Sequence, residues 1–258
     1  MKTDDYSKAQ GHWILAKMGK KVLRPGGREL TMKLVDALSI TPEDEVVEFA
    51  PGMGYTASLV LANNPHSYVG IDKDANAVKN LEQAIKGNNI SFIQANAAVT
   101  DLPSNSKDKV FGEAMLTMHA YHRKVEIIKE AHRILKKGGL YAIHELGLFP
   151  SDLKEDFKAA IQKELAQAIK VNARPLTEHE WKLLLEQEGF RIIKSTTNTM
   201  RLLESMRIIN DEGFFRFLKI SYNIITHAKA RQRILEMRKT FKKHRHHMNA
   251  VVIIAEKI

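Results

Sequence analysis

The 258-residue sequence contains no cysteine, and only 7% of its residues are Phe, Trp or Tyr. The absence of cysteine excludes disulfides, thiolate metal sites and a cysteine nucleophile. No apolar run approaches the ~20 residues that a membrane-spanning helix needs. The first six residues also lack the apolar segment of a signal peptide. From these absences we expect a cytoplasmic protein without a membrane span.

Positive charge is in excess, with 40 Lys and Arg against 30 Asp and Glu and a formal net charge of +10. This excess raises nucleic acid, anionic lipid or an acidic substrate as partners. Much of it lies in residues 227–247, where the pattern predicts a solvated helix that turns Ile234, Leu235, Met237 and Phe241 inward. We favour this interpretation over phosphate contacts, because aromatic residues do not alternate with the basic ones as base stacking requires. The histidines of this run lack the spacing of a metal site.

The most informative stretch is residues 46–62. Residues 46–49, Val-Val-Glu-Phe, have the pattern of a buried strand, and a Pro-Gly-x-Gly turn follows at once. Residues 56–62 then have the pattern of a helix. Gly52 and Gly54 allow a tight turn and the close approach of a ligand, while the helix start presents free N–H groups. Such a unit binds a nucleotide-like ligand at the carboxyl end of a parallel sheet.

The glycine turn alone does not identify the ligand, because its G-x-G-x-x-A spacing also fits the dinucleotide fingerprint of a dehydrogenase. Three further features favour a different ligand. Glu48 stands near the end of the first strand, and Asp72 ends a second apolar run. Asn96, Ala97 and Ala98 follow a third run. The order of these features is an acid, a glycine turn, a second acid and the polar end of a third strand. This order resembles the S-adenosylmethionine (SAM) site of class I methyltransferases.

The resemblance continues through residues 133–139, whose Arg-Ile-Leu-Lys-Lys-Gly-Gly sequence resembles the family's Arg-x-Leu-Lys-x-Gly-Gly signature before its fifth strand. Among subfamilies, the chain is most similar to the small-molecule type 11 methyltransferases. The resemblance implies a mostly parallel seven-stranded sheet, with a last strand at 250–254 that inserts antiparallel between the fifth strand and the sixth, at 190–193. The family usually joins the last two strands by a short hairpin, whereas this chain has a largely helical insertion there.

Apolar periodicity independently predicts helices over 28–38, 75–86 and 124–137, alternating with strands. Alternating units of this kind form an α/β, doubly wound sheet with helices on both faces.

We expect one methyltransferase domain over residues 1–258. Within it, 1–30 would form an N-terminal lid and 40–150 the SAM-binding core. Segments 151–175 and 200–247 would be helical additions that shape the substrate side.

The resemblance implies cofactor-binding roles for residues of the glycine turn and the strand ends. They are Glu48, Ala50, Gly52, Gly54, Asp72, Lys73, Asn96, Ala97, Ala98 and Glu113. Glu48 would meet the amino-acid end of SAM, and Asp72 would accept hydrogen bonds from both ribose hydroxyls. Asn96 and Ala97 would face the adenine. Ala50 stands where the family usually has glycine, and alanine tolerates the turn if its φ stays negative.

Structural roles remain open for the acids. Glu48 and Glu113 could be carboxylates near helix starts, and Asp72 could be an ordinary turn acid.

Methyl transfer requires little from the protein beyond positioning the two reactants, because the methyl group on the sulfonium is already activated. A base is needed only if the nucleophile arrives protonated, and His119 is the best candidate, although a structural role for it stays open. Tyr6, His12 and Trp13 in the lid, and Tyr121 after the fourth strand, are expected to contact substrate or cofactor. Trp13 could instead only anchor the lid to the core.

The sequence therefore predicts a SAM-dependent methyltransferase that transfers a methyl group to a small-molecule acceptor by in-line displacement. One alternative is an NAD-dependent oxidoreductase; NADP is disfavoured because Asp72 has no neighbouring arginine for a 2′-phosphate. Another is a methyltransferase acting on RNA or another anionic macromolecule.

Overall fold

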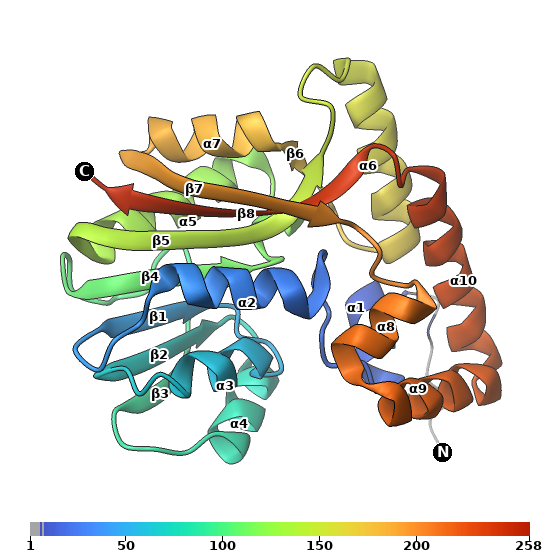
Figure 1. Cartoon of the computed structure of the whole chain (residues 1–258), viewed down its shortest axis with the longest axis horizontal. Coiled ribbons are helices and arrows are strands. Elements are labelled where there is room, and N and C mark those ends of the chain that lie inside the picture. Colours follow the sequence, from blue (N-terminus) through green and yellow to red (C-terminus); the bar gives the residue numbers. More distant parts are fainter. Residues whose placement is uncertain (1–5, 7) are drawn as a thin grey trace.

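A computed structural model describes Tyr6 and residues 8–258 (Figure 1). In this part of the chain, eight strands form one sheet in the order β3-β2-β1-β4-β5-β8-β7, with the short β6 paired to β5. They are β1 (Glu45–Phe49), β2 (Ser67–Asp72), β3 (Ile90–Gln94), β4 (Lys107–Glu113), β5 (Leu135–Leu148), β6 (Leu176–Thr177), β7 (Phe190–Thr199) and β8 (Met248–Lys257). The predicted fold class is confirmed, with β6 as a short addition to the seven expected strands.

Strands β1 to β5 are parallel, whereas β8 runs antiparallel to both β5 and β7. The last strand therefore inserts where the sequence predicted it. Because parallel strands end at the same edge of a sheet, the loops after β1, β2, β3 and β4 converge on one side of the molecule. This edge carries the site described below.

Helices cover both faces of the sheet (Figure 1). They are α1 (Gly11–Lys17), α2 (Gly27–Leu38), α3 (Tyr55–Leu61), α4 (Ala75–Ala84), α5 (Tyr121–Ile134), α6 (Glu155–Ile169), α7 (Glu178–Gln187), α8 (Ser205–Glu212), α9 (Phe214–Thr226) and α10 (Ala228–Lys243), with a 3₁₀ turn at Leu116–Met118. One hydrophobic cluster packs α2, α3 and α4 against the sheet, through residues such as Leu34 and Leu81. A second packs α5 and α7 on the other face, through Ile128 and Trp181.

A third hydrophobic cluster lies beyond the ends of the strands, where α1, α6 and α10 pack together. Ile14 of α1, Leu165 of α6 and Met237 of α10 are buried in it. Helices α8, α9 and α10 form the insertion between β7 and β8, and Figure 1 shows them beside α1 at one end of the sheet. Segments from both ends of the sequence thus enclose the same end of the molecule.

Two details differ from the sequence prediction. The helix expected to reach residue 137 ends at Ile134, and the chain continues directly into β5, where Leu135 pairs with Lys107. The α10 side chain of Leu235 is exposed, whereas Ile234 and Met237 are buried. Residues 234, 237 and 241 share one stripe of the helix, and Leu235 falls outside it. In the described part of the chain, no helix is long and apolar enough to span a membrane.

Candidate active site

A cleft of about 540 Å³ opens at the carboxyl edge of the sheet. Its floor comes from the loops after the first four strands, and its lining includes Gly52, Asp72, Asn96 and Glu113. Residues of the N-terminal segment, including Trp13, line it from the opposite side. The structure therefore brings together the strand ends and the lid segment that the sequence singled out.

The glycine turn after β1 has a left-handed backbone at three positions. Ala50, Gly52 and Gly54 have φ angles of 56°, 57° and 75°. A Cβ at Gly52 would meet nothing nearer than the Ala50 carbonyl oxygen at 3.9 Å, so this position leaves room for a ligand. Gly54 has another reason to be glycine, because a Cβ there would lie 2.7 Å from Leu81. Gly54 does not line the cleft, and its contact with the cofactor stays a prediction.

The positive φ of Ala50 contradicts the expectation that its φ stays negative. This conformation costs an L-residue roughly 1–2 kcal/mol. Glycine relieves that strain, but part of the gain is offset by the greater conformational entropy of glycine in the unfolded chain. We therefore expect Ala50→Gly to raise the free energy of unfolding by ~0.5–1 kcal/mol. Ala159→Gly, at an exposed position within α6, should lower it by about 1 kcal/mol. Urea denaturation of both variants measures these changes. Destabilisation by both would contradict the strain at Ala50.

Asp72, the last residue of β2, is partly exposed and lines the cleft. Its Oδ2 accepts a hydrogen bond from the Gly52 N–H at 3.3 Å, and its Oδ1 accepts one from the Asp74 N–H at 3.0 Å. Each carboxylate oxygen can accept a further bond. The carboxylate is thus held in a fixed orientation and keeps acceptor capacity toward the cleft, as binding of a ribose diol requires.

Glu48 does not line the cleft. Its side chain is buried beneath the glycine turn and accepts a hydrogen bond from the Tyr68 hydroxyl. Burial raises the pKa of Glu48 to about 8, so the carboxyl group is largely protonated at neutral pH. An uncharged carboxyl inside the core replaces the predicted ligand-facing carboxylate.

Protonation of Glu48 has a measurable consequence for stability. Because its pKa rises from 4.5 to about 8 on folding, the folded state retains a proton that the unfolded chain releases, and stability falls as pH rises through this window. We expect Glu48→Gln, which still accepts from Tyr68, to gain stability relative to the wild type between pH ~5 and ~8. Urea denaturation at both pH values measures this. A pH-independent difference would contradict the buried, protonated carboxyl.

The tip after β3 is partly predicted by the sequence. Asn96 and Ala97 line the cleft, whereas Ala98 does not. The Asn96 amide oxygen accepts a hydrogen bond from the Ala98 N–H at 3.1 Å. Ala98 therefore shapes the turn from outside the cleft, and the Asn96 amide NH₂ group is left to face a ligand.

Glu113, at the end of β4, is the centre of a buried polar network. Its carboxylate accepts hydrogen bonds from Arg24, Thr56 and, at 2.8 Å, Thr31. The His144 ring lies 2.6 Å from it through Nδ1. Burial alone would raise the pKa of Glu113, but Arg24 and His144 outweigh it and lower the pKa to about 2.

His144 also connects the network to the N-terminal segment. Its Nε2 lies 2.6 Å from the Pro25 carbonyl oxygen, while its Nδ1 faces the Glu113 carboxylate. The two ring nitrogens thus join the Glu113 carboxylate to the Pro25 carbonyl oxygen, and these contacts fix the loop that carries Arg24.

Helix α8 fixes the same segment from another direction. Backbone N–H groups of Lys21 and Val22 both donate to Glu212 Oε1 at 2.8 Å. The buried Lys20 ammonium lies 3.7 Å from both Glu212 and Asp211. The insertion thus holds the N-terminal segment over the cleft.

The remaining predicted site residues divide into two groups. Lys73, His119 and His12 line the cleft. Tyr6 is buried in the third hydrophobic cluster, and Tyr121 is exposed and donates to Gln187 at 3.3 Å. Neither tyrosine lines the cleft, because Tyr6 is buried in that cluster and Tyr121 begins α5 with an exposed side chain.

These features fit an adenosyl ligand. The glycine turn offers an open backbone approach at Gly52, Asp72 offers a bidentate acceptor, and Ile71 and Ala95 give the lining apolar surface. The same edge of the sheet is where this class of fold binds nucleotides.

Comparison with known proteins decides the family. The Methyltransferase domain family matches residues 47–143. An uncharacterized protein of Haemophilus influenzae is 34% identical over 252 residues, which are 96% of this chain and 98% of that protein. Phosphoethanolamine N-methyltransferase of Plasmodium falciparum is 21% identical over 221 residues, 79% of this chain and 83% of that protein. The chain has the Methyltransferase domain over residues 47–143 and is a SAM-dependent methyltransferase.

A solved structure supports the fold of this methyltransferase. Phosphoethanolamine N-methyltransferase 2 of Haemonchus contortus, in complex with SAM, has a TM-score of 0.69 at 17% identity, over 96% of this chain and 56% of that one. The Methyltransferase domain over residues 47–143 indicates that SAM is the cofactor of this enzyme, as the sequence predicted.

Several residues of the methyltransferase site were not predicted. Arg24 donates a hydrogen bond to Glu113, which lies 89 residues away in the sequence. No local sequence pattern predicts such a pair. Arg123 and Met118 also line the cleft. The sequence analysis gave Arg24 no role, although its side chain lines the cleft.

Proposed function

We propose that this methyltransferase acts on a small-molecule acceptor bound between the cleft and the N-terminal segment. One observation carries the proposal: the cleft adjoins a smaller, apolar chamber lined in part by α1, α6 and α10, and residues such as His12 and Met118 line both spaces. A folded macromolecule presents its reactive groups on a broad surface, whereas a small apolar chamber beside the cofactor cleft suits a small acceptor.

The chain's own residues would bind, orient and shield the reactants. SAM supplies a methyl group that is already activated on a sulfonium. Asp72 would hold the ribose, and the segment fixed by Glu113 and Glu212 would exclude water. Burial lowers the pKa of His12, and burial with nearby cations such as Arg123 lowers the pKa of His119. Both imidazoles are therefore neutral at pH 7 and can accept a proton from a protic acceptor.

Methyl transfer in cell extracts tests this proposal. The purified enzyme is incubated with labelled SAM and separately with extract small molecules, RNA, DNA and protein. We expect label in the small-molecule fraction and saturable binding of S-adenosylhomocysteine but not of NAD. Site-specific label in RNA or DNA would overturn the small-molecule assignment.

A further inference from the structure

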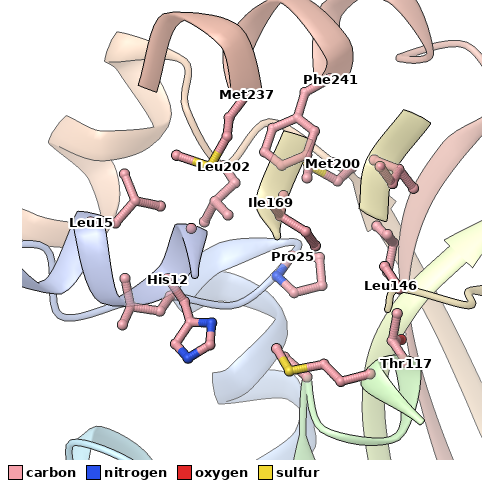
Figure 2. Close-up of a pocket in the computed structure, with 16 residues that line it drawn as sticks. His12, Leu15, Pro25, Thr117, Leu146, Ile169, Met200, Leu202, Met237 and Phe241 are labelled. Atoms are coloured by element: carbon pink, nitrogen blue, oxygen red, sulfur yellow. The ribbon is translucent and has the colours of Figure 1, made fainter. Parts of the chain in front are cut away.

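The chamber beside the cleft has a volume of about 90 Å³, several times the ~10–15 Å³ that one water occupies on a comparable measure. Figure 2 shows Leu146 from the sheet and Met237 and Phe241 from α10 around it. None of its sixteen lining residues is Asp, Glu, Lys or Arg. The chamber can therefore hold a short alkyl chain or a small ring.

Polar groups of a ligand find few partners in this chamber. Thr117 lines it, but its hydroxyl already donates to the buried Glu145 at 2.7 Å. A charged phosphate or carboxylate would be desolvated there without a counter-ion, which costs several kcal/mol. The methionines and Phe241 favour an apolar or aromatic body instead, since thioethers adapt to such shapes and contact ring edges.

His12 stands at the junction of the two spaces. It lines the chamber and the cofactor cleft, whereas His119 lines only the cleft. In Figure 2 its ring lies across the chamber from Phe241. An acceptor whose apolar body fills the chamber would present its other end beside His12.

We propose, on the basis of the proposed methyltransferase function, that the acceptor is an uncharged molecule with a small apolar ring or chain and a hydroxyl group. The apolar body occupies the chamber, and the hydroxyl lies at the mouth beside His12. The hydroxyl proton passes to the His12 imidazole as the oxygen forms a bond to the methyl carbon. The sulfur–methyl bond breaks with its electron pair on sulfur, so that a methyl ether and S-adenosylhomocysteine result, and His12 then releases the proton to water.

This acceptor differs from phosphoethanolamine, the substrate named for two of the relatives. Cationic side chains for a phosphate, such as Lys21, Lys73 and Arg123, line the cleft but not the chamber. Phosphoethanolamine has no apolar body and would leave the chamber empty.

Binding of 4-alkylphenols to the S-adenosylhomocysteine complex tests the chamber. Each CH₂ group buried contributes ~0.8 kcal/mol, so we expect affinity to rise about fourfold per carbon from methyl to propyl and then to level off as the chamber fills. Phosphoethanolamine and glycine should show only weak, nonspecific binding. An affinity independent of chain length would overturn the inference.

Two variants change the chamber in opposite directions. Leu146→Phe should weaken 4-propylphenol binding at least tenfold, and Phe241→Ala should shift the best chain to a longer one. Leu235→Ala, at an exposed position of α10, is the matched control and should leave the profile unchanged. S-adenosylhomocysteine affinity, expected to stay within twofold, verifies that each variant is folded. If Leu146→Phe and Phe241→Ala gave the same dependence of affinity on chain length as Leu235→Ala, the inference would be overturned.

His12→Ala tests the proton acceptor. Transfer of labelled methyl to the best-binding alkylphenol should fall at least tenfold, while transfer to 4-nitrophenol, largely ionised at pH ~8, should be little changed. Absence of transfer to a bound alkylphenol, or equal losses for both phenols, would overturn the role of His12.

The proposed function and this inference can fail separately. If the wild-type protein did not bind S-adenosylhomocysteine, the proposed function would be refuted. Transfer to phosphoethanolamine alone would leave that function standing and refute only this inference.

Discussion

Replacing Glu113 with alanine is expected to lower the free energy of unfolding by about 3–5 kcal/mol, the range for removing one partner of a buried ion pair. The carboxylate is buried and bonds to Arg24, Thr31, Thr56 and His144. Without it, the Arg24 guanidinium remains without its anion. Urea denaturation at pH ~7 measures the loss, and S-adenosylhomocysteine titration should show weaker binding because the loop at Arg24 is released.

Glu126→Ala is the matched control for Glu113→Ala. Glu126 pairs with Arg123 on the exposed surface of α5, where solvent screening leaves such pairs little effect on stability. The Glu113 effect should also depend on pH. Its pKa falls from 4.5 to about 2 on folding, so its contribution is full above pH ~4.5 and is lost as the pH falls toward 2. Equal, small effects of both substitutions would contradict a structural network at Glu113.

Asp72→Ala is expected to weaken SAM binding by ~1–3 kcal/mol, or about 5- to 150-fold, because buried ribose hydroxyls would lose their acceptors. The carboxylate is already oriented by the Gly52 and Asp74 N–H groups, so little ordering is needed when the ligand binds. Calorimetric titration with S-adenosylhomocysteine measures the change.

Asp74→Asn provides the control for Asp72. Asp74 lies two residues away and caps α4 through the Asn76 N–H at 2.8 Å, a role that asparagine also performs. Removing this carboxylate should leave SAM affinity unchanged. If Asp72→Ala also leaves it unchanged, the ribose assignment is wrong.

Local sequence patterns predicted most of the fold and the floor of the cleft. The strand ends at Asp72 and Asn96 follow short apolar runs, and parallel strands place such ends at one edge. The antiparallel last strand and the helical insertion also follow from the resemblance to the family. These features depend on neighbours in the sequence or on a shared topology.

What the sequence could not show depends on contacts between distant segments. Glu48 lies on the same strand as the predicted motif, but its protonated state follows from burial, which outweighs the hydrogen bond from Tyr68, 20 residues away. Gly54 reads as a ligand-facing glycine, and only the packing of Leu81 reveals its other constraint. The chamber is lined in part by α1, α6 and α10, which the sequence analysis placed in a lid and two helical additions without predicting that they meet.

The most direct measurement is an experimental structure with bound S-adenosylhomocysteine. We expect the ribose hydroxyls within hydrogen-bond distance of Asp72, the adenine beside Asn96 and Ala97, and the sulfur facing the junction at His12. An adenosyl group located away from Asp72 and Asn96 would contradict the account of the site.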